Sequence, residues 1–210
     1  MIEKLSLGEP FLETQFIKAE TGFNVPGQGI LLNLDRELAI EVAGELSLPP
    51  LRSLVVSGAT IDVPGRALLV GGAAALDLDD LTTLDCLRGL WKSNWQLTHN
   101  AKQRGVPYYK SPRLCVDGIN MNYCLVSAAD CPSGIHREHS GDVIELHAQI
   151  VGCGAVELLA SADPASVYAA LPLAAGGVHL SLRRADGQYP WHRYHSHSRC
   201  IFLALELPAE

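Results

Sequence analysis

Apolar and polar positions alternate over short runs through much of the chain, a pattern typical of β-strands. In the C-terminal half, turn residues separate such runs, which predict strands at 114–128, 143–151, 155–161, 166–173, 179–183 and 200–207. The first run is broken at Asp117-Gly118, a dipeptide that favours a hairpin. Many short strands with no helical pattern predict a sandwich or barrel for this half.

The N-terminal half mixes strand patterns with one helical pattern. Residues 51–63 and 67–72 predict strands that meet at a Pro-Gly turn. The apolar spacing of residues 34–46 predicts one short helix that ends near Gly44. The acidic run 77–85 predicts either a solvated loop or the start of a helix, because aspartates favour a first helical turn.

A polar segment, residues 90–113, connects the two halves. It carries five of the 16 basic residues and two of the three tryptophans. We interpret it as a boundary between an N-terminal β-rich extension, residues 1–104, and a barrel domain, residues 105–210. The alternative interpretation is a lid, because long loops with aromatic residues often cover sites.

Composition and charge exclude several classes of partner. The chain is 48% hydrophobic and 19% charged, as in ordinary globular proteins. A net charge of −7 without a basic stripe argues against nucleic acid and anionic membrane surfaces. No run approaches the roughly 18 apolar residues of a membrane span, and the N-terminus lacks signal-peptide features, so we expect a cytoplasmic protein. The six cysteines form no CxxC pair and are expected to be small buried hydrophobes.

Candidate chemistry concentrates in one region, because seven of the eight histidines lie between residues 136 and 197. Clustered imidazoles beside a carboxylate suit a metal site or a general acid/base site. In the strand 143–151, Glu145, His147 and Gln149 share one face, because residues two apart point the same way. That polar face either lines a cavity or lies exposed at a sheet edge.

His136 and His139 are three residues apart, so a regular strand would send them to opposite faces. A shared site therefore requires a loop or bulge, and proline, serine and glycine residues on both sides supply one. The spacing is not HExxH and no helix is evident, which excludes a zincin site.

The segment from His136 to Gly152 resembles the first motif of the cupin superfamily, in which a histidine pair precedes a glutamate and the glutamate precedes a glycine by seven residues. Glu145 and Gly152 keep that last spacing. The pair departs from the family, because it is His-x-x-His, with five residues before the glutamate.

Two histidines compete for the role of the family's second-motif ligand. Residues 174–179, AAGGVH, resemble that motif with alanine in place of proline, and they end at His179. His192 instead has the better distance to the closing strand, 200–207.

The resemblance covers about residues 105–210 and implies a double-stranded β-helix, the jelly-roll barrel, that holds a divalent metal. The implied ligands are His136, His139, Glu145 and His179, with His147 and His192 in reserve. Such a donor set suits Fe(II), which we favour, or Zn(II), Ni(II) or Mn(II). The family also implies a homodimer. The extension is either a degenerate second cupin or extra strands, and the presence of only His99 in residues 1–100 favours extra strands.

The segment 189–199, YPWHRYHSHSR, is either the rim of a pocket or a surface loop, and its His195 and His197 can share a strand face. Our candidate catalytic residues are Glu145, His147 and Tyr194, and our candidate substrate-pocket residues are Gln149, Tyr189 and Trp191.

The predicted function is that of a metal-dependent cupin enzyme acting on a small organic molecule, either an Fe(II) oxygenase or a lyase. The alternatives are a non-catalytic sensor or storage cupin, and a structural β-protein whose histidines cluster by chance. Fold alone does not decide among them.

Overall fold

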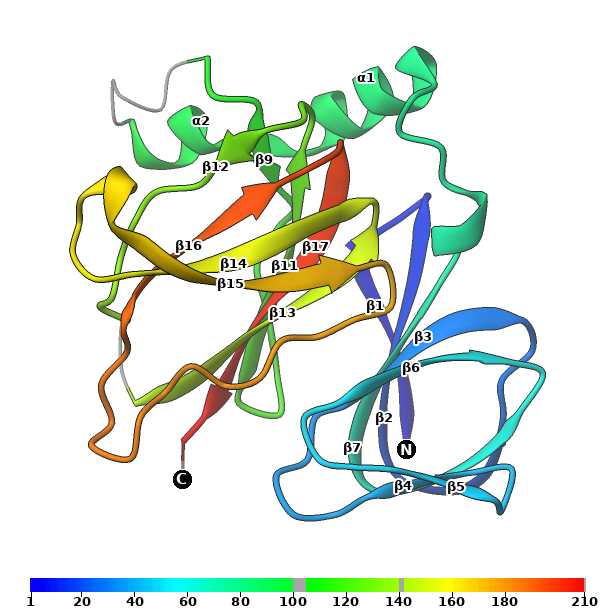
Figure 1. Cartoon of the computed structure of the whole chain (residues 1–210). Helices are drawn as coiled ribbons and strands as arrows, with labels where there is room; N and C mark the ends of the chain where they lie inside the picture. Colours follow the sequence, from blue (N-terminus) through cyan, green and yellow to red (C-terminus); the bar gives the residue numbers. More distant parts are fainter. Residues whose placement is uncertain (100–104, 140–141, 210) are drawn as a thin grey trace. The chain divides into compact units, whose positions relative to one another are not determined.

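The computed structural model describes residues 1–99, 105–139 and 142–209, which fall into two compact units (Figure 1). Unit 1 comprises residues 1–76 together with 176–178, and unit 2 comprises the remainder. The dividing point after Leu76 differs from the sequence-based boundary after residue 104.

Unit 1 is a seven-stranded antiparallel sheet with the order β1-β2-β7-β3-β6, to which β4 and β5 are added. Its strands are β1 (Ile2–Gly8), β2 (Leu12–Asn24), β3 (Gln28–Asn33), β4 (Ile40–Val42), β5 (Leu46–Leu48), β6 (Ser53–Ser57) and β7 (Thr60–Gly71), followed by a short 3-10 helix, η1 (Ala73–Ala75).

The helix predicted for residues 34–46 is wrong. β4 and β5 pair there as a hairpin, in which Ile40 faces Leu48. Ala43 and Gly44 have φ values of 54° and 69°, a left-handed turn that no helix can contain. The apolar residues of this segment therefore alternate along two short strands and do not form the apolar face of a helix.

Unit 2 opens with two helices, α1 (Leu81–Leu90) and α2 (Asn94–Thr98). The Asp80 side chain accepts hydrogen bonds from the backbone N–H groups of Thr82 and Thr83, so the acidic run is a helix start, one of its two predicted alternatives. Trp91, which follows α1, stacks on Tyr123 at 6.0 Å. This packing explains why unit 2 begins before the polar connector. Within the described residues, no helix has the length and hydropathy to cross a membrane.

The strands of unit 2 form two antiparallel sheets, one with the order β13-β17-β11-β9-β8, in which β10 also pairs with β11, and one with the order β12-β16-β14-β15. Their bounds are β8 (Lys92–Ser93), β9 (Tyr108–Lys110), β10 (Leu114–Val116), β11 (Ile119–Val126), β12 (Cys131–Pro132), β13 (Val143–Val151), β14 (Cys153–Leu159), β15 (Val167–Ala174), β16 (Trp191–Ser196) and β17 (Cys200–Pro208). A 3-10 turn, η3 (Pro164–Ser166), precedes β15.

The pairing identifies the topology as a jelly roll. In one sheet the last strand, β17, lies between β11 and β13, and in the other sheet β16 lies between β12 and β14. The chain thus winds its final hairpin between strands laid down earlier, as in a double-stranded β-helix. The predicted fold class, mostly β with a jelly-roll barrel, is confirmed.

Two details of the barrel differ from the sequence analysis. Residues 179–183 form no strand. The segment 189–199 instead contains a true strand, β16, in which His192, Tyr194 and Ser196 are buried.

At the corner between β13 and β14, Gly152 has a φ of 73°, and a Cβ there would lie 2.3 Å from the Arg199 carbonyl oxygen. Only glycine fits this corner.

Candidate metal centre

The polar face of β13 points into the barrel. Glu145 and His147 are only 8% and 6% exposed, so this face is not an exposed sheet edge. Directly across the ladder, Ala204 and Glu206 of β17 face His147 and Glu145. The β13 strand was predicted at its observed bounds, and its period of two places both side chains inside.

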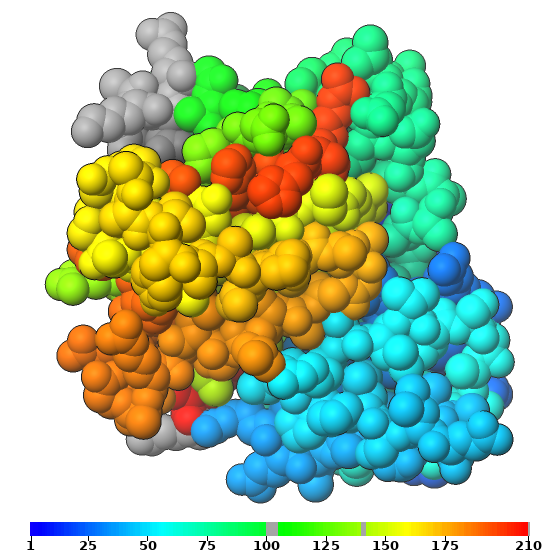
Figure 2. Space-filling view, in the orientation of Figure 1, coloured from blue at the N-terminus to red at the C-terminus, as the bar shows by residue number. Residues whose placement is uncertain are grey.

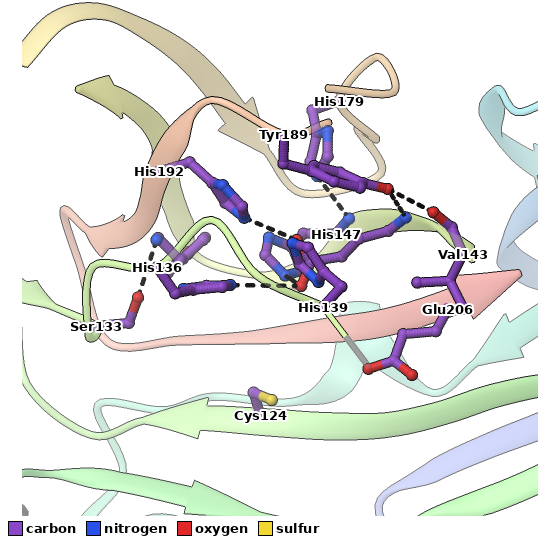
Figure 3. A network of polar contacts seen from close by, with 12 residues as sticks. Cys124, Ser133, His136, His139, Val143, His147, His179, Tyr189, His192 and Glu206 are labelled. Carbon is purple, nitrogen blue, oxygen red and sulfur yellow. Dashed lines mark hydrogen bonds and ion pairs between the residues drawn. The ribbon is translucent and has the colours of Figure 1, made fainter. Parts of the chain in front are cut away.

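Four side chains converge at this end of the barrel, and their ligand atoms all lie within 4.8 Å of one another (Figure 3). We call this set the inner cluster: His136, His139, Glu145 and His192. Measured to the Glu145 carboxylate, the Nε2 atoms of His192, His139 and His136 lie at 3.0, 3.7 and 3.9 Å. Three imidazoles and one carboxylate are a donor set that can hold a divalent cation.

The loop before β13 is tied to β16, and this solves the problem of the His-x-x-His spacing. His136 and His192 form an isolated β-bridge, with backbone hydrogen bonds of 3.0 and 2.9 Å. His139 leaves that register and packs on Tyr189, with ring centroids 4.2 Å apart. The Tyr189 hydroxyl donates to the Val143 carbonyl and accepts from the Glu145 N–H, both at 2.8 Å. Tyr189 therefore fixes both the His139 ring and the start of β13.

Hydrogen bonds on the far side of two rings aim their Nε2 lone pairs at the carboxylate. His136 Nδ1 donates to the Gly134 carbonyl at 3.1 Å, and His192 Nδ1 donates to the Pro190 carbonyl at 2.9 Å. Neutral rings held this way present Nε2 as an acceptor. An acceptor 3.0 Å from a carboxylate oxygen is stable only with a proton or a cation between them.

The third imidazole gives independent support for a cation. His139 Nε2 is buried and has no hydrogen-bond partner among the described residues. An unsatisfied buried nitrogen of this kind is costly, and coordination would satisfy it. The residues present therefore fit a divalent metal.

The electrostatics of the cluster favour its ligand forms. Burial opposes ionisation of Glu145, but the surrounding imidazoles, His147 foremost, outweigh it and hold the pKa of the carboxyl well below its usual value. Burial lowers the pKa of His139 and favours its neutral ring. Burial also lowers the pKa of His136, but Glu145 outweighs it, so that this pKa is raised. The carboxylate is thus charged while one imidazole stays neutral.

His179 lies beside the cluster but points its nitrogens elsewhere. Its Nε2 accepts a hydrogen bond from the His147 backbone N–H at 2.9 Å, and its Nδ1 donates to the Leu180 carbonyl at 2.6 Å. Both ring nitrogens are used, so no lone pair is left for a metal. Of the two competing histidines, the structure brings His192 into the inner cluster.

His179 should make the protein acid-sensitive. Burial, aided by His147, lowers its pKa from 6.5 to about 4. As pH falls below 6.5, the unfolded chain therefore binds a proton that the folded chain refuses until about pH 4, and stability falls through that window. His179→Gln should lack this loss. The difference in unfolding free energy between wild type and His179→Gln should therefore shrink by on the order of 3 kcal/mol between pH 7 and pH 4. Urea titrations at four pH values test this, and parallel pH profiles would contradict it.

A cavity of about 490 Å³ opens beside the inner cluster. Its lining includes His136, His139, Glu145 and His147, the aromatic rings of Tyr108, Tyr194 and Phe202, and the polar residues Lys110, Arg113 and Asn122. Arg113 forms an ion pair with Glu206. Lys110 has no carboxylate partner among the described residues, and its Nζ lies 5.8 Å from the centroid of the Tyr108 ring. Glu138 also belongs to the lining, so the cavity joins a metal-type donor set to charged side chains of both signs, among them the lysine Lys110.

The predicted catalytic and pocket residues lie in different places. His147 has its Nε2 3.5 Å from Glu145 and lines the cavity. The buried Tyr194 hydroxyl donates to Gln149 Oε1 at 2.8 Å and contacts Cys200. Gln149, Tyr189 and Trp191 lie outside the lining of this cavity. Trp191 instead packs under the Arg137 guanidinium, 4.8 Å from its ring centroid.

Sequence reasoning missed the cationic side of the cavity. Lys110 and Arg113 belong to the polar connector, which we interpreted as a boundary or a lid. The available signal was a period of two in β9, where Lys110 is in step with the buried Tyr108.

No family model and no curated protein matches the chain. Among solved structures it is similar to an RmlC-like cupin from Desulfovibrio desulfuricans, at 12% identity over 46% of this chain and 78% of that one, with a TM-score of 0.34. It is also similar to a Cupin 2 conserved barrel domain protein from Leptotrichia buccalis, at 8% identity, 98% and 86% coverage and a TM-score of 0.34. A salicylate 1,2-dioxygenase variant from Pseudoaminobacter salicylatoxidans matches at 12% identity, 98% and 76% coverage and a TM-score of 0.33. With identities of 8–12% and TM-scores below 0.5, these likenesses carry no conclusion about family or activity, and the jelly-roll assignment rests on the strand order.

Proposed function

We propose that this protein is a metal-dependent enzyme that acts on a small organic anion, as an Fe(II) oxygenase or a lyase. The observation that carries the proposal is the convergence of three Nε2 atoms on the buried Glu145 carboxylate, at the wall of a 490 Å³ cavity. Structural histidines would satisfy both ring nitrogens, as His179 does, whereas His139 Nε2 has no hydrogen-bond partner among the described residues.

The inner cluster would hold the metal, and the metal when bound supplies Lewis-acid polarisation or redox chemistry. Three imidazoles and one carboxylate would suit Fe(II), which we favour, and Zn(II), Ni(II) and Mn(II) suit the same donors. Lys110 would bind a carboxylate of the substrate and orient it toward the cluster. His147 is placed to hold or move a proton at the cavity wall, because its Nδ1 is buried without a hydrogen-bond partner in the described part of the chain.

Three aromatic rings in the cavity lining would exclude water from part of the site. Tyr108 and Phe202 pack at 6.1 Å, and Tyr194 stacks on Phe202 at 4.1 Å. A dry wall strengthens the attraction between Lys110 and an anionic group. The lining thus places aromatic rings directly beside His147 and Lys110.

The proposal is tested on protein purified without chelator and reloaded with Fe(II) without air. We expect about one metal ion per chain at the inner cluster, and turnover of at least one small carboxylic acid from a mono- and dicarboxylate panel. Oxygen uptake in step with substrate loss identifies an oxygenase, and substrate loss without oxygen identifies a lyase. Inner-cluster metal that stays below about one-tenth of an equivalent after reloading would overturn the proposal.

A non-catalytic binding cupin is the second candidate, and the position of Lys110 in the cavity lining, outside the inner cluster, favours it. In that case the cavity holds its anion through Lys110 without need of a metal. His136→Ala separates the candidates, because an enzyme loses metal and turnover whereas a binding module keeps its ligand.

A further inference from the structure

A second group of metal-type side chains lies on the opposite face of β16. Asp130, His195 and His197 bring their ligand atoms within 4.8 Å of one another, and we call this set the outer cluster. We propose that it is a binding site for a divalent transition-metal cation of the zinc, cobalt, nickel or copper class, separate from the inner cluster. Ligand atoms about 2.0–2.2 Å from one ion lie roughly 3–4 Å apart, so small side-chain rotations close this set around an ion.

Strand pairing builds the outer cluster. In β16 the buried residues His192 and Ser196 face inward, so His195 and His197 face outward. β12 runs antiparallel to β16 with Cys131 opposite Ser196, and Asp130 and His197 are the residues that directly flank this pair in the chain. The Cys131 N–H donates to Ser196 Oγ at 3.1 Å, which holds that register.

The His195 ring is oriented as a ligand would be. Its Nδ1 lies 2.9 Å from Glu157 Oε1, and Arg193 Nε donates to the other Glu157 oxygen at 2.6 Å. The carboxylate accepts the Nδ1 proton, so Nε2 of the neutral ring carries the lone pair. Metal-binding histidines characteristically donate their other ring nitrogen to a carboxylate, a backbone carbonyl or water.

The Nε2 atom of His195 also favours a cation at this site. It is buried and has no hydrogen-bond partner among the described residues. The neighbouring Glu157 is, by contrast, paired with both Arg193 and His195. A cation at the outer cluster would satisfy the His195 Nε2.

The position of the site also defines what reaches it. Asp130 and His197 are exposed, so an ion can enter from solvent and keep water in its remaining positions. In Figure 2, orange-red atoms of the β16 region reach the surface between the yellow of β14 and the yellow-green of the chain near residue 130. Two imidazoles with one carboxylate select borderline transition metals over calcium or magnesium, which prefer oxygen ligands.

An ion bound at the outer cluster would cross-link β12 and β16. β12 has only two residues, and it leads into the loop that carries His136 and His139. Outer-cluster occupancy therefore steadies the segment that positions two inner ligands, although the outer site needs no inner metal to form.

The test counts Co(II) ions per chain by equilibrium dialysis and elemental analysis. We expect wild type to bind one ion more than His197→Ala or Asp130→Asn, whereas His99→Ala, a matched exposed-histidine control, binds as many as wild type. Both test residues are exposed, so neither substitution disturbs the core. Equal numbers and affinities in wild type, His197→Ala and Asp130→Asn would overturn the proposal.

Two further variants keep the outcome unambiguous. His192→Gln should lose the inner ion and retain the outer one. If the inner cluster binds nothing, wild type binds one ion and His197→Ala none, which supports the outer site and contradicts the proposed function. Cys153 is exposed and its carbonyl accepts from the His197 N–H, so Cys153→Ser excludes a thiol site. Loss of the ion in Cys153→Ser and not in His197→Ala overturns the proposal.

Discussion

His192→Gln is expected to weaken metal binding at the inner cluster by at least about 100-fold. Removing a residue that only hydrogen-bonds to a metal ligand already costs about 10- to 100-fold, and His192 is a proposed ligand itself. His192 is fully buried, its Nδ1 donates to a carbonyl, and its Nε2 lies 3.0 Å from the Glu145 carboxylate. An amide in its place supplies only a weak oxygen donor. The loss should appear in the metal affinity measured by competition with a chromophoric chelator.

The matched control is His179→Gln, the same substitution at the competing histidine. Its amide oxygen can still accept from the His147 N–H, and His179 contributes no free nitrogen to the cluster. Metal affinity should therefore stay within about threefold of wild type. A larger loss in His179→Gln than in His192→Gln would reverse the assignment of the ligand.

The difference between these two histidines shows where sequence reasoning stopped. A period of two within β13 was enough to place Glu145 and His147 on one face, because that geometry is local. The choice of His192 depends on its bridge to His136, a pairing between residues far apart in the chain. No local pattern encodes such a partner, whereas the glycine-rich context that favoured His179 is a local signal.

For the fold as well, local sequence signals could predict some elements and not others. Most strands of the C-terminal half and the hairpin turn at Asp117-Gly118 could be predicted, because turn residues and alternation are local signals. The Pro-Gly turn predicted between strands 51–63 and 67–72 is wrong, because β7 runs through it without a break. The short hairpin of β4 and β5 could not, since two apolar residues per strand fit a helical turn equally well. β16 was obscured by its histidines, which look like a polar loop until the barrel interior buries every second one.

The cationic wall was missed for a related reason. Lys110 was counted with the basic residues of a solvated connector, and a lysine is rarely buried without a partner. In the structure, β9 pairs with β11 so that Lys110 lies opposite Cys124, a residue of the cavity lining. A lysine that a sheet carries into a cavity, with no carboxylate to meet it among the described residues, is typical of an anion-binding site.

Lys110→Met is therefore expected to weaken the binding of a small carboxylate by about 10- to 100-fold, the equivalent of roughly 1.4–2.8 kcal/mol for a hydrogen bond between charged groups. Methionine keeps the length and the apolar stem of lysine, so the packing on Tyr108 is preserved while the charge is lost. Isothermal titration of the metal-loaded protein with the carboxylate that binds best in the panel measures the effect. Its neutral amide should bind weakly to both proteins.

Lys92→Met provides the control, because Lys92 lies opposite Lys110 in the pairing of β8 with β9 but is exposed and outside the cavity lining. It removes the same charge from a neighbouring strand, and screening by solvent should leave carboxylate affinity nearly unchanged. Equal losses in the two variants would mean that only the general field of the protein attracts the anion. A loss confined to Lys110→Met, with metal content unchanged, would assign the substrate contact to one side chain and separate it from the metal.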